Sequence, residues 1–147
     1  MNPPLLEIAC PHCAAINRLP HDKLENLPHC GKCHQALFDG HPVTLTDANF
    51  NTLTGHTGVP VVVDCWAAWC GPCRMFAPVF EQAAQQLEPR LRFAKLDTET
   101  HTATAARLGI RSIPTLIAFR MGKEVARMSG AMPLPQFTSW LQQQGLL

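Results

Sequence analysis

Seven cysteines carry most of the chemistry that this 147-residue sequence can perform, and six of them form pairs with two residues between the partners. Thiols spaced in this way either exchange with disulfides or hold a metal ion. The residues around each pair indicate which of the two chemistries applies. The pairs are Cys10/Cys13, Cys30/Cys33 and Cys70/Cys73, and Cys65 stands alone.

The Cys70/Cys73 pair lies where a predicted strand turns into a predicted helix. Val61–Val63 is a β-branched run typical of a buried strand, and a helical pattern extends over Arg74–Leu87. At a helix start, unpaired N–H groups and the helix dipole favour a thiolate at Cys70. Cys73 follows one turn later, near enough to close a disulfide. We therefore predict a redox site with Cys70 as the exposed nucleophile and Cys73 as the more buried resolving thiol.

Two residues that precede this pair have competing interpretations. Asp64 ends an apolar run, so burial would raise its pKa toward neutrality, where it could exchange a proton with Cys73 through water. The alternative role for Asp64 is to cap a turn. We expect Cys65 to be a buried and inert side chain, the alternative being a second redox thiol that exchanges with Cys70.

The two N-terminal pairs have the spacing of a four-cysteine zinc site, with 16 residues between Cys13 and Cys30. Two tight turns, each with two thiolates, complete a tetrahedral shell around one Zn²⁺. About 40 residues bury only a small hydrophobic core, so we expect a bound metal ion to stabilise this part of the chain. Two further redox pairs or structural disulfides remain the alternative, and neighbouring histidines are alternative ligands. These zinc-site candidates are Cys10, Cys13, Cys30 and Cys33, with His12, His29 and His34 nearby.

Charge and hydropathy exclude several classes of partner. The whole chain has a formal net charge of +1, and residues 1–40 hold three basic against four acidic side chains. Without a basic stripe, we expect no nucleic-acid binding. No apolar run approaches the ~18 residues of a membrane span, so we expect no membrane interaction. The N-terminus lacks the basic and apolar regions of a signal peptide, and we expect a cytoplasmic location.

The order of the predicted elements indicates an α/β protein with a small N-terminal ribbon. We expect a loose lead-in over 1–9, ribbon strands at Ala14–Leu19 and Gln35–Phe38, and a boundary near Asp39–Pro42, which divides the chain into 1–40 and 41–147. Strands that alternate with helices, followed by a hairpin and a helix, predict an α/β sandwich. The expected strands of the second part are Val43–Leu45, one from Val61, Leu91–Leu96, Thr115–Phe119 and Glu124–Met128. The expected helices run from Thr46 or Asp47 to Leu53, Arg74–Leu87, Glu99–Leu108 and Leu134–Leu141.

The region from about residue 41 to residue 147 resembles the thioredoxin family. The motif Trp69-Cys70-Gly71-Pro72-Cys73 matches the family letter for letter, and Ser112-Ile113-Pro114-Thr115 resembles its cis-proline loop. Further residues on family positions are Asp64, Pro78, Lys95, Gly122 and Gly130. The resemblance implies a mixed five-stranded sheet flanked by four helices. With the preceding cysteine pairs, the chain resembles the zinc-containing thioredoxins of bacteria.

The resemblance also implies a function and a substrate surface. It implies a protein-disulfide reductase that acts as a monomer on cytoplasmic proteins, with electrons from an NADPH-dependent thioredoxin reductase. It implies one zinc per chain and no organic cofactor. It places Lys95 beside Asp64, although a solvated strand residue is the alternative, and it implies a cis Pro114. The implied substrate platform comprises Trp69, Gly71, Pro72, Ile113, Pro114, Gly130 and Ala131.

Three positions depart from the commonest thioredoxins, and two other functions remain open. Ser112 and Ser129 replace Gly and Val, which makes the platform slightly more polar, and Cys65 replaces a Phe. An oxidase or isomerase would be expected to carry other residues between the cysteines and an export signal. A redox-regulated chaperone or zinc-dependent interaction module would use the second part only as a scaffold.

Overall fold

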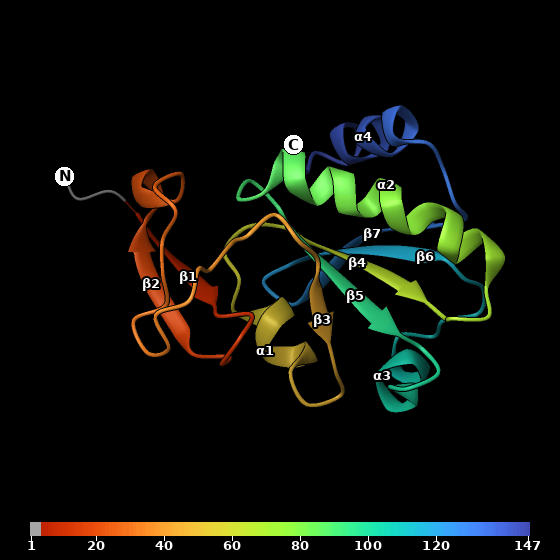
Figure 1. Cartoon of the computed structure of the whole chain (residues 1–147), viewed down its shortest axis with the longest axis horizontal. Helices are drawn as coiled ribbons and strands as arrows, with labels where there is room; N and C mark the ends of the chain where they lie inside the picture. The colour runs from red at the N-terminus through yellow and green to blue at the C-terminus, as the bar shows by residue number, and fades with distance from the viewer. Residues whose placement is uncertain (1–3) are drawn as a thin grey trace.

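A computed structural model describes residues 4–147 and arranges their strands in two separate sheets (Figure 1). The smaller sheet is an antiparallel pair of β1 (Leu5–Ala9) and β2 (Ile16–Pro20), followed by a 3₁₀ turn, η1 (His21–Lys23). The larger sheet has five strands in the order β3-β5-β4-β6-β7. Its strands are β3 (Val43–Leu45), β4 (Val61–Trp66), β5 (Arg92–Asp97), β6 (Thr115–Arg120) and β7 (Lys123–Ser129).

Helices cover both faces of the larger sheet. The α-helices of residues 4–147 are α1 (Phe50–Gly55), α2 (Gly71–Leu87), α3 (Thr102–Arg107) and α4 (Leu134–Gln143). In Figure 1, α2 and α4 lie above the sheet, and α1 and α3 lie below it. Strand β4 runs parallel to β5 and antiparallel to β6, so the sheet is mixed. The predicted fold class, with five strands and four helices, is confirmed.

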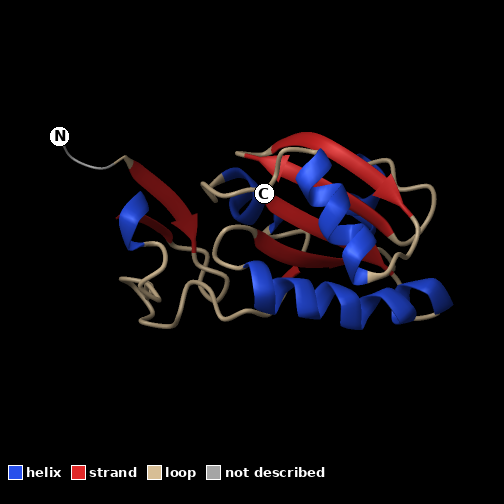
Figure 2. Ribbon diagram, turned by 90° about the horizontal axis from the view of Figure 1, so that it is seen from above, coloured by secondary structure: helices blue, strands red, loops and turns tan. Residues whose placement is uncertain are grey.

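Alternation along β4 separates two cores, because successive strand residues point to opposite faces. Val62 packs on the α2/α4 face, whereas Val61 and Val63 pack on the α1/α3 face. The first core is rich in aromatic side chains, several of them in edge-to-face contact, and Figure 2 shows the two helices that cover it. These aromatic side chains are Phe76, Phe80, Phe93, Phe137 and Trp140.

The structure corrects two expectations about the ribbon. The lead-in expected over 1–9 contains strand β1, in which Ile8 and Ala9 are fully buried; residues 1–3 lie outside the described part. The strand expected at Gln35–Phe38 is reduced to a single bridge between His29 and Ala36. Strand β2 therefore pairs with the segment before the first cysteine pair and not with Gln35–Phe38. The N-terminal prolines do not prevent this pairing, because a proline disrupts a strand only near its own position.

Two helices begin later than expected because polar side chains hold the preceding residues in turns. Asn49 and Thr46 exchange side-chain-to-backbone hydrogen bonds, so α1 begins only at Phe50. Asp97 accepts the N–H groups of Glu99 and Thr100, so α3 begins only at Thr102. These side chains compete with the helical backbone for the same donors.

The ribbon packs against the end of the larger sheet that is opposite the start of α2 (Figure 1). The Ala9 N–H donates to the His56 carbonyl (2.9 Å), and the Gly58 N–H donates to the Glu7 carbonyl (2.7 Å). A Cβ at Gly58 would lie 3.0 Å from the Leu6 side chain and 3.2 Å from the Glu7 carbonyl, so the close approach favours glycine. Strand β1 thus joins the loop that leads into β4.

The ribbon and the part of the chain that follows residue 40 also share hydrophobic packing. Ala9 belongs to the core on the α1/α3 face, and Val59 belongs to the core of the ribbon. The two parts therefore share buried surface as well as backbone hydrogen bonds. Among residues 4–147, no helix has the length and apolar character needed to cross a membrane.

Candidate functional site

The Cys70/Cys73 pair occupies the N-terminus of α2. Cys70 has extended backbone angles and is the N-cap residue, and its Sγ accepts the Cys73 N–H at 3.2 Å. Pro72 lies in the first turn, where a missing N–H has no cost. The two sulfurs are joined in a disulfide. The strand-to-helix transition predicted from the sequence therefore positions a redox-active pair.

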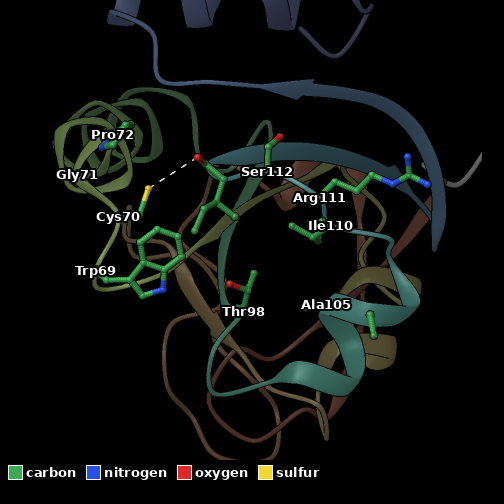
Figure 3. A pocket seen from close by; sticks show the side chains of 11 residues that line it. Trp69, Cys70, Gly71, Pro72, Thr98, Ala105, Ile110, Arg111 and Ser112 are labelled. Atoms are coloured by element: carbon green, nitrogen blue, oxygen red, sulfur yellow. Dashed lines mark hydrogen bonds between the residues drawn. The ribbon is translucent and has the colours of Figure 1, made fainter.

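The two cysteines are equally buried, which corrects the expectation of an exposed Cys70. Their exposed fractions are 3% for Cys70 and 2% for Cys73. The Cys70 sulfur lies 3.8 Å from the Ile113 carbonyl, under the loop that contains the cis Ile113–Pro114 peptide. Figure 3 shows this contact as a dashed line. Access to Cys70 therefore comes from the cavity beside it.

A cavity of about 610 Å³ opens beside Cys70. Trp69 forms one wall and is 67% exposed, and its indole Nε1–H donates to a Glu99 carboxylate oxygen at 2.8 Å. The opposite wall comes from the segment before the cis proline, where Ile110 faces the cavity and Arg111 extends away from Cys70 (Figure 3). A fixed aromatic wall opposite an aliphatic one suits an extended peptide segment.

The structure divides the predicted substrate platform into two groups. Trp69, Gly71, Pro72 and Ile113 line the cavity together with Cys70. Pro114, Gly130 and Ala131 do not line it. The Gly130 N–H donates to the Pro114 carbonyl at 2.8 Å, and Ala131 lines a separate, smaller cavity beside Met75 and Met132.

The two serines that depart from the family pattern bond each other. The Ser112 hydroxyl donates to the Ser129 hydroxyl at 3.2 Å, and Thr115 lies 3.0 Å from the same Ser129 oxygen. Thr115 also donates to the Ser112 carbonyl at 2.6 Å. This network connects the start of β6 to the end of β7 and satisfies the hydroxyl groups locally.

Asp64 is a fully buried carboxyl on the face of β4 that packs against α2, the helix that carries Cys73. Neither of its oxygens has a hydrogen-bond partner among the described residues. Burial raises the pKa of Asp64 to about 7, and the Lys95 charge opposes part of that shift. A group with this pKa can gain or lose a proton near neutral pH.

Strand register places Lys95 beside Asp64. The two residues are paired neighbours in the parallel β4–β5 ladder. Lys95 shares the face of β5 that carries the buried Phe93, and its Nζ lies 4.9 Å from the centroid of the Trp66 ring. This distance allows a cation–π contact between the ammonium group and the ring.

Cys65 points away from the redox pair. It packs with Val61 and Val63 on the α1/α3 face, opposite Asp64. Burial, together with the Asp64 charge, raises the pKa of the Cys65 thiol to about 12. A thiol with this pKa is a poor nucleophile at neutral pH.

The four ribbon cysteines converge on one point, with all four sulfurs within 4.8 Å of one another. The Sγ atoms of Cys10 and Cys33 are 3.6 Å apart, as are those of Cys13 and Cys30. A tetrahedral Zn²⁺ with bonds of about 2.3 Å separates its sulfurs by about 3.8 Å. The donor set and its dimensions therefore fit zinc. Within residues 4–147, the group contains these cysteines and none of the neighbouring histidines.

Backbone and side-chain N–H groups surround these sulfurs. The N–H groups of His12 and Lys32 each lie 3.4 Å from a cysteine sulfur, and the Asn17 amide lies 3.5 Å from Cys30. The Cys33 N–H and the Asn17 amide lower the pKa of the Cys30 thiol, whereas burial raises the pKa of the Cys10 thiol. N–H donors of this kind orient metal-binding thiolates.

Sequence reasoning missed two residues that line the cavity, Ile110 and Arg111, and one that holds its Trp69 wall, Glu99. All three lie in loops or turns, where no periodic pattern identifies them. The adjacency of Ile110-Arg111 to the predicted cis-proline loop was the available signal. Glu99 had no local signal, because its role depends on Trp69, thirty residues away.

A disulfide at a helix N-terminus, opposite a cis-proline loop on a mixed sheet, defines a thiol–disulfide oxidoreductase. The sequence profile described as Thioredoxin matches residues 41–143, and the profile described as Thioredoxin 2, N-terminal, a zinc ribbon, matches residues 9–35. The chain belongs to the thioredoxin family and is a protein-disulfide reductase.

One named relative supports this assignment over almost the whole chain, and others support it over two thirds of the chain. Thioredoxin C-3 of Corynebacterium nephridii is 46% identical over 137 residues, which cover 93% of this chain and 94% of the relative. Thioredoxin 1 of a Nostoc species is 43% identical over 98 residues, covering 67% of this chain and 92% of the relative. The thioredoxin of Haemophilus influenzae is 36% identical over 99 residues, also 67% of this chain and 92% of its own length.

Proposed function

We propose that this protein reduces disulfide bonds in cytoplasmic proteins by cycling Cys70 and Cys73 between dithiol and disulfide. The observation that carries the proposal is the position of the pair at the N-terminus of α2, with Cys70 on the wall of a peptide-sized cavity. The cavity admits an extended chain, and the helix start favours the thiolate that attack requires.

Cys70 acts as the nucleophile. Its thiolate attacks one sulfur of a substrate disulfide, forming a mixed disulfide and releasing the other substrate sulfur as a thiolate. The Cys73 thiolate then attacks Cys70, which releases the second substrate thiol and closes the Cys70–Cys73 disulfide. Substrate segments lie along the predicted platform, namely Trp69, Gly71, Pro72, Ile113, Pro114, Gly130 and Ala131.

Asp64 moves the proton of Cys73. Because its pKa is about 7, its carboxylate can accept the Cys73 proton through a water and return it when the disulfide is reduced. Lys95 tunes this proton transfer by limiting how far the pKa of Asp64 rises.

An insulin assay with NADPH and a bacterial thioredoxin reductase tests this function. We expect insulin reduction to depend on both the reductase and this protein, because a buried disulfide is reduced efficiently only by a partner that fits its cavity. Turnover with dithiothreitol but none with the reductase would refute the proposed electron donor. No turnover with either would refute the reductase function itself.

We further propose that residues 1–40 bind one structural zinc through Cys10, Cys13, Cys30 and Cys33, apart from the catalytic domain 41–147. Zn²⁺ would cross-link the two turns of the ribbon, which has little core of its own. Six residues of β4 separate the ribbon end of the sheet from the redox end, a span of roughly 20 Å.

Zinc removal should therefore leave catalysis nearly unchanged. We expect metal analysis to find one zinc per chain and to find none in a Cys30→Ser variant. Chelation should change insulin turnover by less than about twofold, because distant sites act almost independently. A large loss of turnover in chelated protein that remains folded would favour a regulated chaperone or interaction module.

A further inference from the structure

Arg92 is the largest side chain in the fully buried part of the protein, with only 1% of its surface exposed. It begins β5 in the catalytic domain, yet its Nη2–H donates to the Leu37 carbonyl of the ribbon at 2.6 Å. Its guanidinium carbon also lies 4.0 Å from the centroid of the Phe38 ring. A single side chain of the catalytic domain thus holds two consecutive residues of the ribbon.

Leu37 closes the hairpin that carries the second cysteine pair. The Leu37 N–H donates to the Pro28 carbonyl, and the Cys30 N–H donates to the Gln35 carbonyl. The carbonyl that Arg92 binds is therefore at the base of the segment that presents Cys30 and Cys33. Phe38, Leu37, Cys10 and Cys30 also belong to one buried cluster.

The charge of Arg92 is incompletely balanced by its protein neighbours. The nearest carboxylate oxygen, on Glu88, lies 3.9 Å from Nη1, and neither Nε nor Nη1 has a hydrogen-bond partner within residues 4–147. Glu88 is also buried, which raises its pKa to about 7, and its two carboxylate oxygens already accept the Gly40 and Phe93 N–H groups. A buried cation in this setting gains from further negative charge.

The proposed zinc site provides such a charge. Four thiolates around one Zn²⁺ carry a net charge of −2, close to the buried cluster that Arg92 contacts. Cys10 and Cys30 share a buried cluster with Leu37 and Phe38, the two ribbon residues that the Arg92 guanidinium contacts.

We propose that Arg92 is a positioning residue of the zinc site, reaching from the catalytic domain to fix the base of the Cys30/Cys33 hairpin and to balance the charge of the thiolate centre. The first cysteine pair is fixed in a parallel way, since the Ala9 N–H, next to Cys10, donates to the His56 carbonyl. The catalytic domain therefore preorganises both arms of the ribbon. This inference rests on the proposed zinc site and goes beyond it.

Zinc transfer to a chromogenic chelator tests the proposal on the full-length protein. We expect Arg92→Gln to weaken zinc affinity roughly 10- to 100-fold, the range typical of outer-shell residues of metal sites, and to speed zinc release as a result. Arg92→Lys, which keeps the charge, should fall between Arg92→Gln and wild type. The matched control is Arg90→Gln, because Arg90 is exposed two residues away and loses the same charge.

A second variant tests whether faster zinc release in Arg92→Gln results from a general loss of stability. Glu88→Gln/Arg92→Met removes both buried charges while preserving most of the volume, which is often neutral or stabilising for folding. We expect it to retain insulin turnover and thermal stability yet still release zinc faster. Its Co²⁺-substituted form should show altered thiolate-to-metal absorption bands, which a merely structural role would leave unchanged.

The outcomes separate this inference from the zinc site on which it rests. Wild-type release rates in Arg92→Gln and in the double variant would overturn the role of Arg92 while leaving the zinc site intact. Equal acceleration in Arg90→Gln would also overturn it, since the effect would then reflect net charge. A wild-type protein that binds no zinc would refute the zinc site itself, and the positioning role with it.

Discussion

A Cys73→Ser variant should accumulate stable mixed disulfides with its substrates, whereas Cys70→Ser should form none. Cys70 lies on the wall of the cavity and accepts the Cys73 N–H, so it is the sulfur that a substrate disulfide reaches. Without Cys73 the mixed disulfide has no resolving thiol. Both variants should lose insulin turnover by about a thousandfold or more, as expected when a covalent catalyst loses an essential group.

Non-reducing mass spectrometry of proteins captured by each variant checks this assignment. The control is Cys65→Ala, because Cys65 packs on the opposite face of the sheet and should leave turnover unchanged. Adducts on Cys70→Ser instead of Cys73→Ser would reverse the two roles. Trapping by neither variant under oxidising conditions would contradict the exchange mechanism.

Asp64→Asn should make the protein more stable at neutral pH and slower in turnover. The folded pKa of Asp64 is about 7, above the ordinary value of 3.8, so the folded state binds more protons between these values. The protonated carboxyl makes its full contribution to the free energy of unfolding below pH 3.8. This contribution decreases as the pH rises from 3.8 and is lost above the folded pKa of about 7. The total loss is up to about 4 kcal/mol, at 1.36 kcal/mol per pH unit.

The amide keeps the shape of the carboxyl but cannot ionise, so the variant avoids this loss. Its buried N–H₂ group has its own desolvation cost, which reduces the net gain. Insulin turnover should fall on the order of 10²-fold, because Cys73 loses its proton acceptor.

Thermal melting across pH 4–9 distinguishes the two effects. The stability difference between Asp64→Asn and wild type should grow between pH 4 and pH 7 and then level off. Asp22→Asn is the control, since Asp22 is exposed on the ribbon and should show no such trend. An Asp64→Asn protein that melts lower at pH 8, or that turns over as fast as wild type, would make Asp64 an ordinary structural carboxyl.

Local sequence was sufficient to predict the redox centre. The β-branched run before Asp64, the helical pattern after Cys73 and the two-residue spacing of Cys70/Cys73 all describe neighbours along the chain. Strand alternation, helix dipoles and tight turns act over a few residues, so such patterns specify them directly. The same holds for the spacing of the four ribbon cysteines, which converge as expected.

Contacts between distant segments decided the rest. The burial of Cys70 depends on Ile113, and the orientation of Trp69 depends on Glu99. Arg92 occupies a polar position in an alternating strand, yet the ribbon covers it almost completely. Alternation predicts which face a side chain takes but contains no information about what packs on that face. Only the tertiary structure brings the ribbon onto Arg92 and places its cysteines at the end of the sheet opposite Cys70.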